Sequence, residues 1–317
     1  MKKLFRSTPG TPASPPPEHG DWRVPLEHPE EAEHLPPPPS VWRRMRLRAE
    51  FLQAGGVGSH DYTGAEDDAP PVVPISGAAR ALRLAIAWLL LLPLSIVMVY
   101  ALLLHLYHHA ATTVGQLSFW LSEPVWYSLL GAGAFCALII SRVANPVLIY
   151  IYVLGHELTH AIAAVISLGH VQTLRIDLDG GYVETDADNL FIALSPYFVP
   201  LWMCCWLLIL WAANALFPFP EWRAWFYAGL GFWWCFHLYW TLWVIPREQP
   251  DMLENGLLFS LLLIMVMNIG ILLVILYLFG LLAPGAYAND LLTAAGQIYD
   301  MLQTLYNDLV RLAQASY

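Results

Sequence analysis

Residues 147–168 read VLIYIYVLGHELTHAIAAVISL, an apolar run that contains the polar group HELTH at positions 156–160. At 1.5 Å per residue, a helix of this length can cross the ~30 Å hydrocarbon core of a bilayer. Glu157 is the only Asp, Glu, Lys or Arg between Arg142 and Arg175. Because an ionisable side chain in lipid costs several kcal/mol, we expect it to face a cavity inside the protein.

Apolar segments of similar length recur along the chain, which has a mean hydropathy of +0.51 and only 13% charged residues. Most are long enough to span a bilayer, so the sequence predicts an all-α polytopic membrane protein with about six transmembrane helices. The second segment is the shortest and contains Gly131 and Gly133, which makes a re-entrant segment the alternative there. The predicted spans lie near residues 84–104, 125–141, 147–168, 190–216, 224–245 and 256–282.

Composition divides the chain into three parts. Residues 1–76 are polar and rich in proline, which predicts a disordered tail. Within it, residues 41–53 carry arginines beside apolar side chains and could form a short helix on an anionic membrane surface. Residues 77–285 form the predicted membrane domain, and residues 286–317 an amphipathic C-terminal helix. Its apolar seam could pack on the protein itself, the membrane or a second copy, and we favour the first two together.

Charge bears on partners and on orientation. The net charge is −10, the acids lie mainly in the tail and in loops, and no basic patch is interleaved with aromatic residues. We therefore do not expect nucleic-acid binding. Arginines in the ranges 43–48 and 80–83 predict a cytosolic N-terminus, and we expect a multi-pass protein of the bacterial cytoplasmic membrane. Six complete spans would place residues 171–185 outside the cell, whereas a re-entrant second segment would reverse this.

A strand pattern follows the HELTH segment. Leu174, Ile176 and Leu178 alternate with polar residues, and the Asp-Gly-Gly sequence at 179–181 then turns the chain. Strict alternation indicates a half-buried strand, and glycine permits the backbone conformations of a tight turn. Residues 171–185 are therefore predicted to form a β-hairpin beside the membrane.

The HELTH sequence predicts a zinc site. His156 and His160 are four residues apart on a predicted helix, so both imidazoles point to the same face. Neutral imidazole binds Zn²⁺ well, and two such ligands supply half of a tetrahedral site. Glu157, next to the first ligand, is placed to act as a general base. A packing group of polar residues without metal is the alternative.

Two histidines leave the site incomplete, and three residues are candidates for the third ligand. Asp179 lies in the predicted hairpin, where an aspartate is more typical of a turn. His237 lies in the fifth predicted span at a depth that differs from that of His156 by only ~6 Å. Asp251 lies beyond the end of that span and would reach the site only if the chain folds back after Pro246. We take His237 as the first choice and Asp251 as the alternative.

Three features of the sequence resemble the site-2-type intramembrane zinc metalloproteases. The first is HELTH within a span, and the second is Gly-Gly-Tyr-Val at 180–183 in the following hairpin. The third is Ala-Leu-Ser-Pro at 193–196, where the family often has Ala-Gly-Pro at the start of the next helix. Together they cover about residues 147–200, with a weaker match to about 270. HELTH is the most specific of the three.

The resemblance implies an intramembrane zinc metalloendopeptidase that cleaves a peptide bond in or near a substrate's transmembrane helix. His156 and His160 would hold zinc, and Glu157 would be the general base. The hairpin would bind an unwound substrate by main-chain hydrogen bonds along Gly181, Tyr182 and Val183. The family's usual third ligand, an aspartate within an Asn-x-x-Pro…Leu-Asp-Gly pattern, is not matched after residue 200; the nearest sequence is Pro-Asp at 250–251.

Other functions fit parts of the same pattern. A catalytically inactive membrane scaffold or binding protein would keep the fold and could keep the metal. A transporter could use His237, Asn268 and Glu157 along a solute path, but the two halves of the chain show no internal repeat. Asn268 is also a candidate for holding an unwound substrate backbone, with a helix–helix hydrogen bond as the alternative.

Overall fold

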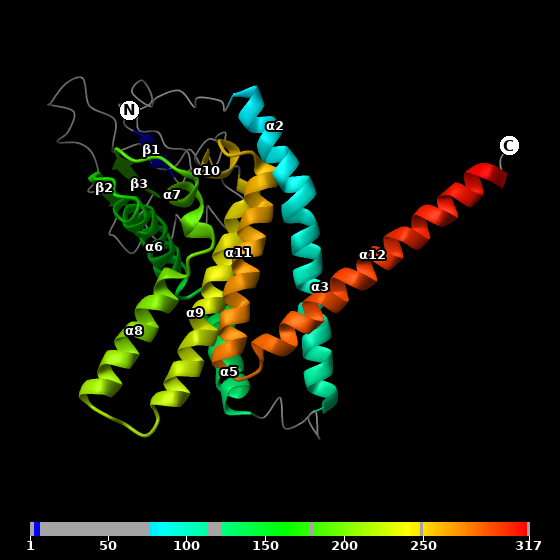
Figure 1. The fold of residues 1–317 in the computed structure, drawn as a ribbon. Coiled ribbons are helices and arrows are strands. Elements are labelled where there is room, and N and C mark those ends of the chain that lie inside the picture. Colours follow the sequence, from blue (N-terminus) through cyan, green and yellow to red (C-terminus); the bar gives the residue numbers. More distant parts are fainter. Residues whose placement is uncertain (1–2, 7–75, 113–121, 178–179, 248–249, 316–317) are drawn as a thin grey trace.

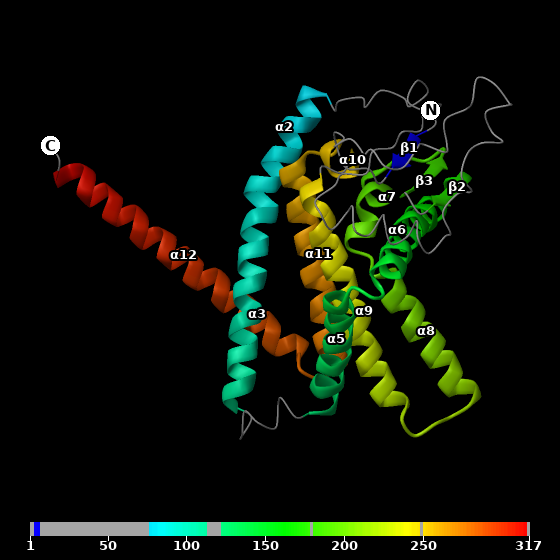
Figure 2. The ribbon, with the colours of Figure 1, turned by 180° about the vertical axis from the view of Figure 1, so that it is seen from behind.

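A computed structural model describes residues 3–6, 76–112, 122–177, 180–247 and 250–315. These residues form a helical bundle with a small sheet at one end (Figures 1 and 2). Most of the disordered tail predicted for residues 1–76, with its basic segment at 41–53, lies outside the described residues; the prediction is wrong for Lys3–Arg6, which form a strand because they pair with the predicted hairpin. The helices are α2 (Gly77–Ile86), η2 (Ala87–Leu91), α3 (Leu92–Thr112), α5 (Glu123–Ser141), α6 (Asn145–Ile166), α7 (Leu190–Leu194), η3 (Ser195–Tyr197), α8 (Leu201–Leu216), α9 (Trp222–Val244), η4 (Ile245–Arg247), α10 (Pro250–Leu253), α11 (Leu257–Leu278) and α12 (Pro284–Ala315).

Among the described residues, four helices are long and apolar enough to cross a membrane: the continuous helix from Gly77 to His108, α5, α6 and α11. A fifth crossing is added if the bent pair of α7–η3 and α8 is counted as one span. All six predicted segments are helical, but the count of six spans is not confirmed. The remaining segment, α9, does not qualify as a span. It is rich in tryptophan and tyrosine, whose polar groups lower its mean hydropathy.

Close packing of α5 on α9 explains the glycines of the second segment. A Cβ atom at Gly131 would lie 1.8 Å from the backbone oxygen of Ala228, and one at Gly231 would lie 2.0 Å from that of Ser128. Only glycine permits this approach, as in other small-residue contacts between membrane helices. Beside this contact, Phe135 of α5 packs on aromatic side chains of α9 and supports the helix that carries HELTH.

A break divides the fourth apolar segment next to the site. The axes of α7–η3 and α8 differ by 74°, and Pro196 and Pro200 flank the bend. Proline cannot donate the backbone hydrogen bond that would continue the helix, so the chain turns here. The turn buries Ser195 and Tyr197 inside the protein. This apolar segment is thus interrupted where it packs beside the polar residues of α6.

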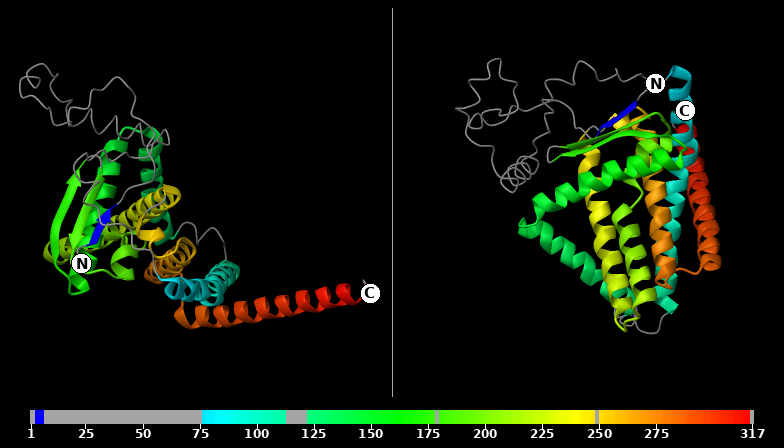
Figure 3. Two further views of the ribbon diagram at one scale, coloured as in Figure 1. Left: turned by 90° about the horizontal axis from the view of Figure 1, so that it is seen from above. Right: turned by 90° about the vertical axis from the view of Figure 1, so that its left-hand side faces the viewer.

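The predicted hairpin is present and belongs to a three-stranded antiparallel sheet. β2 (Val171–Asp177) pairs with β3 (Gly180–Thr185), and the order of strands is β1-β3-β2. The additional strand β1 (Lys3–Arg6) comes from the N-terminus and pairs with the other edge of β3. Strands so far apart in sequence lie side by side at the same end of the bundle as α10 (Figures 1 and 3). The N-terminus and the hairpin therefore share one side.

Candidate metal centre

One face of α6 carries the polar residues of HELTH. His156, Glu157 and His160 are 3%, 0% and 0% exposed, so none of them faces the outer surface of the bundle. Their neighbour Thr159 donates its hydroxyl hydrogen to the Gly155 carbonyl at 2.6 Å, which satisfies this side chain within the helix. The four-residue spacing thus places both imidazoles in the interior, as the helical period predicts.

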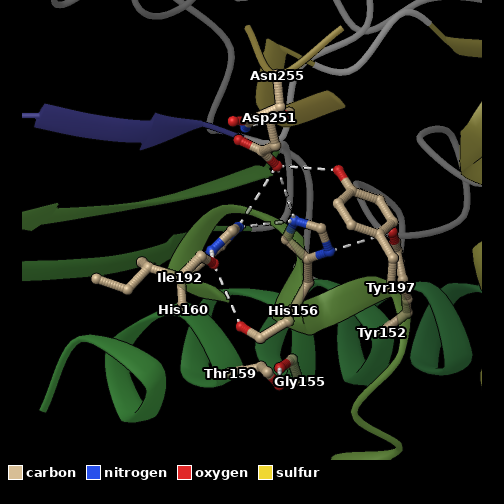
Figure 4. Close-up of polar contacts among 10 residues, drawn as sticks. Tyr152, Gly155, His156, Thr159, His160, Ile192, Tyr197, Asp251 and Asn255 are labelled. Carbon is tan, nitrogen blue, oxygen red and sulfur yellow. Dashed lines mark hydrogen bonds and ion pairs between the residues drawn. The ribbon is translucent and has the colours of Figure 1, made fainter. Parts of the chain in front are cut away.

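Asp251 completes the cluster from a distant part of the sequence (Figure 4). After α9, the chain folds back through η4 into α10, and the Asp251 carboxylate meets both imidazoles. Its Oδ2 atom lies 3.8 Å from His156 Nε2 and 3.5 Å from His160 Nε2, and the two Nε2 atoms are 3.2 Å apart. Within the part of the chain that the structure describes, this is the one group of three residues with metal-ligand spacing.

The three separations fit a tetrahedral zinc site. Ligand atoms that lie ~2.0–2.2 Å from a tetrahedral zinc are roughly 3.3–3.6 Å from one another. The observed spacings of 3.2, 3.5 and 3.8 Å lie within a few tenths of an ångström of that range. Small side-chain adjustments would therefore complete the site. Three protein ligands leave the fourth tetrahedral position open, which is the arrangement of catalytic zinc sites and not of structural ones.

A hydrogen bond fixes the orientation of His160 in the cluster. His160 Nδ1 lies 2.8 Å from the Ile192 carbonyl of α7, which can only accept, so Nδ1 carries the hydrogen. In the neutral ring, Nε2 then presents a lone pair toward Asp251 and His156. Convergence of a lone pair and a carboxylate oxygen favours a cation between them. A ligating histidine whose other nitrogen donates to a carbonyl is the usual arrangement in metal sites.

Asp251, the candidate third ligand, is held by its own network. The Tyr197 hydroxyl donates to Asp251 Oδ2 at 2.9 Å, and the Asn255 amide donates to the Asp251 backbone carbonyl at 2.9 Å. Met252 is fully buried, and burying a side chain of this size stabilises the short helix α10 by about 1.5–3 kcal/mol. These contacts hold a four-residue helix in place although it forms few internal hydrogen bonds.

Asp251 is suited to bind a cation. Burial acts to raise the pKa of its carboxyl, but when the rings of His156 and His160 are protonated at Nε2, their hydrogen bonds and charge outweigh burial and hold the pKa below the ordinary value. The carboxyl is therefore ionised at neutral pH. Because an ionised carboxylate offers only acceptor oxygens, its negative charge adds to the preference of the cluster for a metal ion.

Glu157 lies directly under the hairpin. A Cβ atom added at Gly181 would lie 2.5 Å from the Glu157 Cγ atom, so β3 approaches this side chain as closely as a backbone can. Val183, two residues on, is fully buried, while Tyr182 points the other way and is partly exposed. Gly181 and Val183 therefore line the side of the site that carries the candidate general base.

The structure places His237 outside the cluster, contrary to its choice as third ligand. Its Nε2 atom lies 3.2 Å from Asn268 Oδ1, and the Asn268 amide donates to the carbonyl of Tyr197 at 2.9 Å. A similar depth in the bundle does not bring His237 to His156, because α9 directs the His237 side chain toward α11. His237 and His156 both line one hollow, together with Trp202 and Phe236. Asn268 thus binds backbone of the chain itself.

Tyr197 is a site residue that sequence reasoning missed. Its ring packs edge-on against His156, with 5.3 Å between ring centroids, and its hydroxyl holds Asp251. Tyr152 also contacts His156, with its hydroxyl 3.4 Å from Nδ1. The signal available in the sequence was a tyrosine between Pro196 and Pro200 within an apolar segment, since a broken membrane helix usually lines a site.

Comparisons with known proteins do not assign the chain to a family. A scan of protein-family models, a search of curated proteins and a search of solved structures each find no match. The geometry of the cluster is therefore the basis for assigning a function.

Proposed function

We propose that this chain is an intramembrane zinc metalloprotease that hydrolyses a peptide bond in or near a transmembrane helix of a membrane-protein substrate. The observation that carries the proposal is the convergence of His156, His160 and Asp251 at metal-ligand distances beside Glu157. A structural cation site or a packing group has no need of a fully buried glutamate next to its first histidine. Such a glutamate is costly in lipid and is typical of a functional site.

Each residue has a distinct part in the proposed reaction. His156, His160 and Asp251 would hold the ion, which supplies Lewis-acid polarisation of the scissile carbonyl and lowers the pKa of water to roughly 7. Glu157 would accept a proton from the attacking water and deliver it to the leaving amine nitrogen. Tyr197 would keep Asp251 in place, and the Ile192 carbonyl would keep His160 in the tautomer that binds a metal.

The sheet supports a position for the substrate. A helical scissile bond is closed to attack, so the substrate must unwind, and an extended segment can add to the edge of a sheet. The edge of β3 that faces α10 is taken by β1, which contacts α10 as well. We therefore place the substrate strand where β1 lies, after displacement of β1. The hollow between His156 and His237, lined by Trp202 and Phe236, would accept a substrate side chain.

The shared end of the N-terminus and the sheet supports an orientation for the proposed protease. Arg80 and Arg83 lie in α2, at the end of the bundle that also carries β1, β3 and α10 (Figure 1). Under the positive-inside rule this end would face the cytosol of a bacterium, with the protein in the cytoplasmic membrane. The hairpin would then be cytosolic as well, which agrees with the side on which site-2-type proteases usually carry this loop.

The proposal is tested with purified protein and a single-span model substrate in detergent micelles. Wild-type protein should cleave the substrate, while Glu157→Gln should hold zinc as the wild type does and lose about 100-fold or more of the cleavage rate. Glu123→Gln, on the exposed start of α5, is the matched control and should cleave normally. Cleavage by Glu157→Gln at the wild-type rate would remove the residue from the reaction and overturn the proposal.

A further inference from the structure

The C-terminal helix α12 packs on the bundle with one face only. Tyr287 donates to the Met98 carbonyl at 3.3 Å, Asp290 binds two histidines of α3, and Ala294 is fully buried. These residues, with Gln297, lie along one side of the first half of the helix. Beyond them α12 leaves the bundle and projects away from it (Figures 1 and 3).

An apolar face with a period of seven residues also runs along α12; Leu291 and Ile298 of this face adjoin the docked residues and are partly buried, and the rest of the face turns away from α3. Three rows make up this face, and each row advances by seven positions. Seven of its large side chains are more than half exposed: Leu292, Tyr299, Leu302, Leu305, Tyr306, Leu309 and Leu312. The rows of the apolar face are Leu291, Ile298, Leu305 and Leu312; Leu292, Tyr299, Tyr306 and Ala313; and Ala295, Leu302 and Leu309.

A seven-residue apolar period is the pattern of helices that pair with other helices. Two such rows at alternating spacings of three and four keep the same seam facing a partner over several turns. Residues 291–313 span three heptads and, at 1.5 Å per residue, roughly 33 Å. The seven exposed side chains together offer an area on the order of the ~800 Å² per partner that stable interfaces bury.

The charges of α12 do not suit an anionic membrane surface. Helices that lie on such membranes carry lysine and arginine along the polar side. In α12 the charged residues are Asp290, Asp300, Asp308 and Arg311, so the helix is acidic and has no lysine. Asp308 already pairs with Arg311 at 3.7 Å. An acidic polar side is repelled by anionic lipid, but it is compatible with pairing between two helices whose polar sides face water.

We propose that the apolar face of α12 binds the α12 of a second copy of this chain. A partner helix must match the apolar face in period and in length. The α12 of a second copy matches in both, because identical heptads present identical seams. The rows that contain Leu292 and Leu302 lie roughly 130° around the helix from the residues docked on α3, so pairing through these two rows leaves the contacts within the chain unchanged. This inference does not depend on the proposed protease activity.

The first test measures the mass of the full-length protein in detergent by light scattering. We expect twice the chain mass for the wild type and for Thr304→Lys, which lies on the polar side between Asp300 and Asp308. The double variant Leu302→Lys and Leu309→Lys should have the mass of one chain and keep the wild-type unfolding temperature of the bundle. A wild-type mass of one chain, or a double variant that stays at twice that mass, would overturn the proposal.

The second test probes the native membrane with single cysteines placed from position 299 to 311 and a bismaleimide, with the unmodified chain as background. Crosslinking between copies should be strong at 299, 302, 306 and 309 and weak at 300, 304 and 311. Crosslinking without this period contradicts the proposal. So does a lack of crosslinking combined with protection of the apolar positions from a water-soluble thiol reagent, which would show that lipid covers the face.

Discussion

The hydroxyl of Tyr197 lies 2.9 Å from Oδ2 of Asp251, the carboxylate that completes the group with His156 and His160. Tyr197 stands at the break between α7 and α8, and Asp251 stands in the short helix α10, more than fifty residues later. One hydrogen bond therefore joins the two irregular segments of the bundle at the site. The Tyr197 hydroxyl donates to the same oxygen, Oδ2, that faces the two histidines, and so orients the carboxylate toward them.

Removal of this hydroxyl should weaken metal binding. Tyr197→Phe keeps the ring that packs on His156 but removes the donor to Asp251. Loss of a group that orients a ligand typically costs 10–100-fold in metal affinity, and we expect a reduction of about this size. Competition for zinc with a chromophoric chelator measures it. Tyr277→Phe, at an exposed position of α11, is the control, and equal affinity of the two variants would exclude the positioning role of Tyr197.

A methyl group at position 181 should separate metal binding from catalysis. Gly181→Ala places a Cβ atom 2.5 Å from Glu157 Cγ, and the buried glutamate must shift because β3 is held by strands on both sides. We expect zinc content to be kept and cleavage to fall about 100-fold, since a general base must lie within hydrogen-bond reach of its proton. Gly133→Ala, where nothing lies within 4 Å, should cleave normally. Loss of zinc from Gly181→Ala would instead indicate damage to the whole site.

Much of this arrangement could be predicted from local patterns. The apolar runs give the positions of the helices, because each is long enough to need a bilayer. The spacing of His156 and His160 places them on one face of α6, and alternation followed by two glycines gives the hairpin. These features depend on residues that are close in sequence, for which the helix and strand periods are reliable.

The other features of the site depend on contacts between segments that are distant in sequence, and the helix and strand periods do not predict such contacts. Asp251 and His237 are both plausible third ligands in the sequence. The choice between them depends on the turn of the chain through η4 and on the direction in which α9 points His237. The role of Tyr197 depends on the direction of a bend, which two prolines predict only as a break. The strand β1 is four residues long and stands before a proline-rich stretch, so its pattern is too short to detect.

The N-terminal strand should compete with substrate for β3. Leu4 pairs with Glu184, and proline at position 4 would remove a backbone donor and disrupt strand pairing. We expect Leu4→Pro, or deletion of residues 2–6, to raise kcat/KM for the model substrate several-fold. Leu4→Val keeps strand-forming character and should behave as the wild type. A fall in kcat/KM for both altered chains would mean that β1 is a permanent part of the sheet that the active site requires.

The stability of α12 docking should depend on pH through Asp290. Burial acts to raise the pKa of this carboxyl, but hydrogen bonds from His105 and His108, at 2.8 and 2.9 Å, outweigh it and lower the pKa. A lowered folded-state pKa contributes stability above the unfolded value of about 3.9. That contribution disappears as pH falls through the folded value, because the carboxyl is then protonated in both states.

The corresponding measurement is the unfolding temperature of the wild type and of Asp290→Asn in detergent. We expect the wild type to be the more stable protein at pH 7, and the difference between the two to shrink as the pH falls below about 4. A difference in unfolding temperature that stays constant down to acidic pH would show that the Asp290 carboxylate does not contribute through its charge.

The zinc content of purified protein tests the central claim most directly, because it requires no substrate. Wild-type protein and His237→Ala should each hold about one zinc per chain, since the structure places His237 on Asn268 and outside the ligand group. Asp251→Ala and the double variant His156→Ala and His160→Ala should hold almost none at micromolar zinc. Wild-type protein without zinc, or Asp251→Ala with a full equivalent, would contradict the assignment of this metal centre.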